Sequence, residues 1–272
     1  MEQPRPDMAP LKSKLRATWM AGDFGQIAKS YERGAAEYVA RLDLRPGMRV
    51  LDVACGTGNL ALPAARAGAS VTGVDIAPNV LDAGRARANA EGLTIQFDEG
   101  DAEDMSYPDG AFDVVVTMFG AMFAPQPEKA ARELTRVCRP GGLVAMANWA
   151  PAGFIGQMFK TTSTYVPPPP GIAPPVLWGD EATVQQRLDG KLAELRFQRR
   201  FMTFTFPFAV PEVVEFWRQY YGPTQRTFDA LEADTQAAYR RDLERLWSEH
   251  NRATDGTTRV ESEYLEVQAI RA

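Results

Sequence analysis

Histidine, cysteine and long apolar runs are scarce in this chain of 272 residues. One histidine and two cysteines do not make up a zinc-binding constellation, and we expect no metal site. No run approaches the roughly 18 apolar residues of a transmembrane helix, and the N-terminus lacks the apolar core of a secretory signal. These absences favour a protein of the reducing cytoplasm that does not insert into membranes.

An excess of positive charge is also missing. The net charge is -5 and the pI is near 5.2, which disfavours a nucleic-acid backbone as the main partner. A content of 45% hydrophobic and 24% charged residues is that of an ordinary globular protein. The length allows one large domain, or one domain with a substantial insertion.

The most informative pattern surrounds a glycine turn. Two apolar runs with strand character, residues 49–54 and 70–74, are separated by this turn and by an alanine-rich segment with helical spacing. Gly56 and Gly58 allow the backbone to pass close to a ligand. The helix that follows offers free N–H groups, and Asp75 can accept both hydroxyls of a ribose. The pattern predicts a nucleotide-type cofactor site at the carboxyl edge of a parallel sheet.

Two classes of cofactor fit this turn. Gly56, Gly58 and Ala61 also match a dinucleotide-binding pattern, with the acidic residue roughly 20 positions further on. Asp52 lies at the base of the turn, where its carboxylate would repel a pyrophosphate and attract an ammonium group. The string from Asp52 to Gly58 resembles the first motif of class I S-adenosylmethionine (SAM)-dependent methyltransferases. Ala54 replaces the first glycine of that motif.

Later segments extend the resemblance. Residues 100–113 are similar to the family's third-strand and fourth-strand motifs, and residues 139–142 to the turn before its fifth strand. The resemblance implies that Asp101 accepts the adenine amino group and that the Ala102 N–H meets a ring nitrogen. The alternative for Asp101 is a loop aspartate that caps a turn.

The family implies SAM as the cofactor and S-adenosylhomocysteine as its product. Tyr31 lies in a segment that resembles the N-terminal cover of many small-molecule methyltransferases, where an aromatic residue reaches the cofactor; the alternative is a core tyrosine with a polar tip. The expected cofactor-binding residues are Tyr31, Asp52, Ala54, Gly56, Gly58, Asp75, Ile76, Asp101, Ala102 and Met118.

The composition of residues 118–123 indicates the class of acceptor. Relatives that methylate amino groups of nucleobases carry Asn/Asp-Pro-Pro-aromatic there, whereas this chain has apolar and sulfur side chains. Aromatic residues of the expected cover favour a small aromatic or apolar acceptor, although aromatic side chains also pack in cores. The expected acceptor-lining residues are Trp19, Phe24, Phe119, Met122, Trp149 and Tyr221.

Methyl transfer needs no dedicated catalytic residue when proximity and desolvation supply the rate. His250 is the only histidine of the sequence and is the candidate base for a hydroxyl acceptor. Its position at the end of a charged helix, where histidine complements the helix dipole, is the alternative. We expect O-, N- or C-methylation of a small molecule. An RNA or protein methyltransferase and a nicotinamide-dependent oxidoreductase are the alternatives.

These patterns predict a Rossmann-like α/β fold, a seven-stranded, mostly parallel, doubly wound sheet with the final strand antiparallel. Residues 1–25 form a tail and a helix, and residues 26–149 the SAM-binding core. Residues 150–272 complete the same domain, with insertions at 150–176 and 211–251 that cover the substrate. The sequence is compatible with a homodimer.

Overall fold

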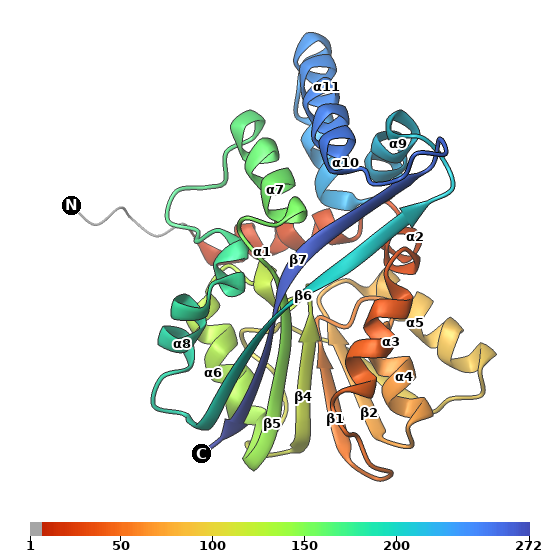
Figure 1. Ribbon diagram of the computed structural model, residues 1–272. Helices are drawn as coiled ribbons and strands as arrows, with labels where there is room; N and C mark the ends of the chain where they lie inside the picture. The colour runs from red at the N-terminus through yellow and green to blue at the C-terminus, as the bar shows by residue number, and fades with distance from the viewer. Residues whose placement is uncertain (1–6) are drawn as a thin grey trace.

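A computed structural model describes residues 7–272, and the first part of the expected N-terminal tail, residues 1–6, lies outside them. The centre is a seven-stranded sheet in the order β3-β2-β1-β4-β5-β7-β6. The first five strands of that order are parallel, and β7 runs antiparallel to β5 and β6. Helices cover both faces (Figure 1). The predicted fold class and the antiparallel final strand are confirmed.

The strands are β1 (Arg49–Val53), β2 (Ser70–Asp75), β3 (Ile95–Glu99), β4 (Phe112–Met118), β5 (Cys138–Trp149), β6 (Leu192–Phe206) and β7 (Thr258–Arg271). The helices are α1 (Met8–Trp19), α2 (Phe24–Lys29), α3 (Glu32–Ala40), α4 (Ala61–Arg66), α5 (Pro78–Ala90), the 3-10 turn η1 (Ala121–Phe123), α6 (Pro127–Val137), α7 (Phe154–Tyr165), the 3-10 turn η2 (Pro175–Gly179), α8 (Glu181–Leu188), α9 (Val210–Tyr220), α10 (Gly222–Asp229) and α11 (Ala233–His250). None of these helices combines the length and the apolar character that crossing a bilayer requires, across residues 7–272.

The order of the strands reverses between β1 and β4. From β1 the chain proceeds outward through β2 and β3, then returns to place β4 on the other side of β1. Both central strands are almost fully buried and rich in valine, as expected for parallel strands that are covered on both faces. The carboxyl ends of β1 and β4 therefore meet at the position where open α/β sheets bind their ligands.

The antiparallel pair of β6 and β7, called a hairpin below although α9, α10 and α11 lie between the two strands in the chain, extends beyond the rest of the sheet. β5 pairs with β7 only from Tyr264 to Ile270, whereas residues 258–263 of β7 pair with β6 alone. Figure 1 shows this free end of the hairpin rising to α9, α10 and α11. The hairpin thus carries the late helices to the carboxyl edge of the parallel strands, where α1 also lies.

One predicted element is wrong, and other segments contain more breaks than a single helix would. Tyr31 separates α2 from α3, and the segment of the expected insertion at 211–251 is made of α9, α10 and α11. The expected turn at 139–142 is part of β5, because a register shift lets the strand absorb these residues against β4.

The N-terminal segment and the late helices touch through their backbones. Gly22 and Tyr221 form an isolated antiparallel bridge, and the Asp23 N–H donates to the Tyr220 carbonyl oxygen at 3.1 Å. A Cβ atom on Gly222 would lie 2.0 Å from the Thr18 carbonyl oxygen. Glycine at position 222 therefore lets α10 begin directly against the end of α1.

Substitution Gly222→Ala tests this contact. The new methyl group would meet the Thr18 backbone, which cannot rotate away, and we expect a loss of about 1–3 kcal/mol in the free energy of unfolding. The matched control is Gly34→Ala in α3, whose Cβ would meet only the flexible end of the Met202 side chain. Urea unfolding measures both variants. Equal stability of Gly222→Ala and Gly34→Ala would contradict the contact.

Candidate active site

A cavity of about 1000 Å³ opens at the carboxyl edge of β1, β2 and β4. All of the predicted cofactor-binding residues except Gly58 line it, namely Tyr31, Asp52, Ala54, Gly56, Asp75, Ile76, Asp101, Ala102 and Met118. Gly58 has a φ of 85°, and a Cβ atom there would lie 2.5 Å from the Leu62 side chain. Its role is to shape the turn and to admit α4, and the prediction that it contacts the cofactor has no support from its position.

Asp75 holds the glycine turn in place. Its carboxylate accepts the Gly56 N–H at 2.8 Å and the Ala77 N–H at 3.0 Å. Burial raises the pKa of this carboxyl, although these backbone hydrogen bonds oppose the shift. Each carboxylate oxygen can accept a further hydrogen bond, so that the same group can hold hydroxyls of a ligand. Gly56 and Ala54 both have positive φ, 53° and 54°, which turns the loop sharply beneath this carboxylate.

Asp52 lies deeper, with 1% of its surface exposed. Its carboxylate accepts the Ala61 N–H at 3.0 Å, at the beginning of α4. Burial raises the pKa of this carboxyl well above its usual range. No arginine, lysine or histidine of residues 7–272 forms an ion pair with it. The cavity thus contains a buried acid without a positive partner.

The loop after β4 presses against the turn after β1. A Cβ atom on Gly120 would lie 2.5 Å from the Ala54 carbonyl oxygen, so this close approach requires glycine. Phe119 beside it has a φ of 56°, a region that costs an aromatic residue about 1 kcal/mol or more. Its ring stacks on Trp149, with 3.5 Å between ring centroids and 7° between planes. The stacking fixes a strained residue at the edge of the cavity.

A second cavity of about 360 Å³ adjoins the first. Its lining is aromatic except for two isoleucines, and it contains no charged side chain; the residues are Trp19, Phe24, Ile27, Tyr31, Phe119, Phe123, Trp149, Ile155, Phe204, Trp217 and Tyr221. The two cavities share Trp19, Phe24, Tyr31, Phe119 and Phe123. The shared rings form the boundary between a polar chamber and an apolar one.

Five of the expected acceptor-lining residues border this second cavity, and Met122 does not. Met122 is buried in η1 and lines neither cavity. His250 also lines neither cavity, because it ends α11 and packs its ring against Phe154, with 5.3 Å between centroids. The position of His250 fits the alternative of a helix-terminal residue and gives no support to its role as a base.

Several lining residues escaped the sequence analysis. Trp217 precedes Tyr221 by one helical turn, a spacing that indicates a shared face once either residue is assigned to the site. Phe204 lies in β6 and Ile155 in α7, and no local sequence pattern indicates that either element reaches the cavity.

α1 is bound to the rim of the larger cavity. The Lys12 ammonium lies 2.5 Å from carboxylate oxygens of both Asp101 and Glu103. Arg16, one turn later, pairs with Glu99 at 2.7 Å and donates to the Ile76 carbonyl oxygen at 3.1 Å. These contacts lay α1 across the ends of β2 and β3. Asp101 does not serve only as a turn cap, although it also accepts the Glu103 N–H at 2.9 Å.

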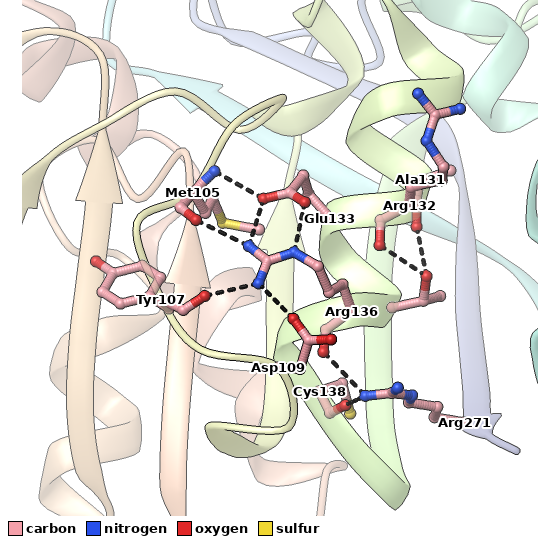
Figure 2. Close-up of polar contacts among 10 residues, drawn as sticks. Met105, Tyr107, Asp109, Ala131, Arg132, Glu133, Arg136, Cys138 and Arg271 are labelled. Carbon is pink, nitrogen blue, oxygen red and sulfur yellow. Dashed lines mark hydrogen bonds and ion pairs between the residues drawn. The ribbon is translucent and has the colours of Figure 1, made fainter.

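Arg136 anchors the loop that carries Asp101. Figure 2 shows its guanidinium between the loop and α6, donating to the carbonyl oxygens of Met105 and Tyr107. The same group pairs with Glu133 in its own helix and with Asp109. Three of these contacts, to Met105, Tyr107 and Asp109, hold a loop that has little regular structure.

Comparisons with known proteins point to methyltransferases. A family model described as a methyltransferase domain matches residues 51–146. An uncharacterised protein of Mycobacterium tuberculosis is 38% identical over 216 residues, which cover 79% of each chain. Demethylmenaquinone methyltransferase of Thermus thermophilus is 42% identical over 116 residues, 41% of this chain and 53% of that protein.

Among solved structures, phosphoethanolamine N-methyltransferase 2 of Haemonchus contortus, in complex with S-adenosyl-L-methionine, shares the fold. The TM-score is 0.52 at 18% identity, and the match covers 88% of this chain and 52% of that one.

Asp52→Asn tests the unpaired acid. The amide oxygen can still accept the Ala61 N–H, but the variant carries no buried charge. Because the folded pKa of Asp52 is raised, the unfolded state loses its proton first as pH rises above about 3.9, and wild-type stability falls from there upward. We expect the variant to melt above wild type at pH 7 and the difference to shrink toward pH 4. Each 1 kcal/mol corresponds to about 2–4 °C in a chain of this size.

Thermal melting from pH 4 to pH 8 measures this difference. The control is Asp82→Asn, an exposed aspartate on α5 outside both cavities, whose melting difference should be small at every pH. A difference for Asp52→Asn that vanishes at neutral pH would show that the acid has a positive partner.

Proposed function

Because the chain belongs to the class I SAM-dependent methyltransferases, we propose that it binds SAM in the larger cavity and methylates a small, largely apolar or aromatic acceptor in the smaller one. The observation that carries the proposal is the pair of adjoining cavities with a shared aromatic boundary. One chamber offers carboxylates, and the other offers rings and no charge. A donor with charged and polar ends and a neutral acceptor fit this division.

The residues of the larger cavity match the chemistry of SAM. The Asp75 carboxylate would accept the ribose hydroxyls, and Asp101 with the Ala102 N–H would hold the adenine edge. Asp52 would meet the ammonium group of the methionine part, either directly or through the backbone around Gly56. Binding of that cation would supply the positive partner that the described chain does not give Asp52.

SAM supplies a methyl carbon on positively charged sulfur. When bound, it would give this carbon to the acceptor atom as the carbon–sulfur bond breaks; S-adenosylhomocysteine would leave with the electron pair of that bond, and an O–H or N–H acceptor would release its proton to solvent. The aromatic boundary, with Tyr31 and Phe119, attracts a cation through its ring faces and excludes water. Because no charged side chain lines the acceptor chamber, orientation and desolvation are the contributions that these residues make.

The segments that cover the acceptor chamber support a small molecule over RNA or protein as the acceptor. α1, α2 and the α9–α10 junction meet above this chamber through the backbone contacts at Gly22 and Gly222. We further propose that the protein acts in the cytoplasm, which agrees with two cysteines that are both free thiols.

Ligand-dependent melting tests the cofactor. SAM and S-adenosylhomocysteine should raise the melting temperature, since a ligand that binds only the native state stabilises it, and NAD should not. Asp75→Asn should weaken S-adenosylhomocysteine binding by about tenfold or more, because hydrogen bonds to a charged group contribute about 1.5–3 kcal/mol. Asp82→Asn is the control and should bind as wild type does. Stabilisation by NAD alone would overturn the assignment.

Activity with labelled SAM tests the acceptor. Phenols, quinones, thiols and amines are offered beside an RNA pool and a protein pool. We expect label to enter neutral ring compounds and to be absent from both macromolecule pools. Labelling confined to RNA or protein would contradict the proposed acceptor class while leaving the cofactor site intact.

A further inference from the structure

The turn that would hold the cofactor is bound by an arginine that lies outside the cavity. Arg87 belongs to α5 and lines neither cavity. Its guanidinium donates to the Thr57 carbonyl oxygen at 2.9 Å and to the Asn59 amide oxygen at 2.7 Å. Both residues follow Gly56 closely in the chain and line the larger cavity. Arg87 therefore fixes one half of the glycine turn without occupying the site.

The same guanidinium also holds the segment that covers the cavity. It pairs with the carboxylate of Glu32, the first residue of α3. Asn59, its partner in the turn, donates its amide N–H to the Ala28 carbonyl oxygen at 2.9 Å, in the last turn of α2. This carbonyl oxygen also accepts the Tyr31 N–H at 3.3 Å. The end of α2 and the beginning of α3 are thus both connected to Arg87, the first through Asn59 and the second directly.

Tyr31 is the residue that these contacts place. It separates α2 from α3, and it lines both cavities. Its ring meets the Phe119 ring edge-on, with 5.9 Å between centroids. Burial and the Asp52 carboxyl raise the pKa of its hydroxyl, whereas the Arg87 guanidinium lowers it. The charge of Arg87 therefore reaches the boundary between the two chambers, although its side chain stays outside both.

We infer that Arg87 is a positioning residue of the methyl transfer, which sets the spacing between the glycine turn and Tyr31. The inference rests on the proposed function and assigns to it a residue outside the cavities. Where orientation and desolvation supply the rate, a misplacement of about 1 Å can cost about 100-fold. Arginine suits this role because its planar group presents several N–H donors in fixed directions.

The alternative is that Arg87 only stabilises the fold, and α5 offers a matched control for it. Arg85 pairs with Asp82 and donates to the Phe97 carbonyl oxygen at 2.6 Å. None of these three residues lines either cavity. Arg85→Met therefore removes an ion pair and a backbone contact from the same helix and leaves the Arg87 contacts in place. A purely stabilising role moves the melting temperature but not the affinity for a ligand of the folded protein.

Titration of S-adenosylhomocysteine into the full-length protein tests the inference, with dissociation constants measured by calorimetry well below each melting temperature. Arg87→Met should weaken binding by about tenfold, because the turn and Tyr31 no longer keep one spacing. In a Tyr31→Ala background the same substitution should cost less than about threefold, since the residue that Arg87 positions is absent. Arg85→Met should lower the melting temperature and keep the wild-type affinity.

Arg87→Lys keeps the test decisive if Arg87→Met does not fold. It retains the charge but not the planar set of donors, and it should bind S-adenosylhomocysteine severalfold more weakly than wild type while Tyr31 is present.

Wild-type affinity in the Arg87 variants, or a loss of equal size with and without Tyr31, would overturn the inference. A loss of affinity in Arg85→Met as large as that in Arg87→Met would overturn it as well. Failure of the wild-type protein to bind S-adenosylhomocysteine would instead count against the proposed function, so the two failures are distinguishable.

Discussion

A carboxyl group without a counter-ion lies at the base of the main cavity, and the function proposed for that cavity depends on it. The side chain of Asp52 is buried beside the start of α4. Among the described residues, its hydrogen-bond partner there is the backbone N–H of Ala61. A buried acid of this kind reduces stability unless a positive group joins it. Residues that bind ligands often carry such a cost. The ammonium group of an amino-acid-like cofactor would remove the cost, which makes Asp52 a binding group rather than a packing defect.

The same edge of the sheet also concentrates backbone strain. Ala54 and Phe119 are non-glycine residues with positive φ, and Gly120 brings their two loops into contact. This contact sets the spacing between the β1 turn and the β4 loop, and Phe119 of the β4 loop stacks on Trp149. Strained residues cluster at functional sites when the surroundings determine them fully. Here the boundary between donor and acceptor chambers is the place where strain and aromatic stacking coincide.

The fold and most residues of the polar cavity could be predicted from the sequence. The glycine turn, Asp75 and Asp101 lie in short segments that follow neighbouring strands, so that a local pattern identifies each of them. The residues that cover the acceptor cavity could not be predicted in the same way. Trp217 and Phe204 reach the acceptor cavity through the long β6–β7 hairpin, a placement that no local pattern encodes. Lys12 and Asp101, which form an ion pair, are 89 positions apart in the sequence. Met122 and His250 were singled out by type and by proximity in sequence, yet side-chain direction and helix packing keep both away from the cavities.

A crystal structure with bound S-adenosylhomocysteine tests the central claim most directly. The account predicts the ribose on the Asp75 carboxylate, the amino group of the homocysteine part beside Asp52, and the sulfur at the aromatic boundary formed with Tyr31 and Phe119. A nucleoside bound with its amino group away from Asp52, or a ligand found outside the β1–β4 edge, would contradict it.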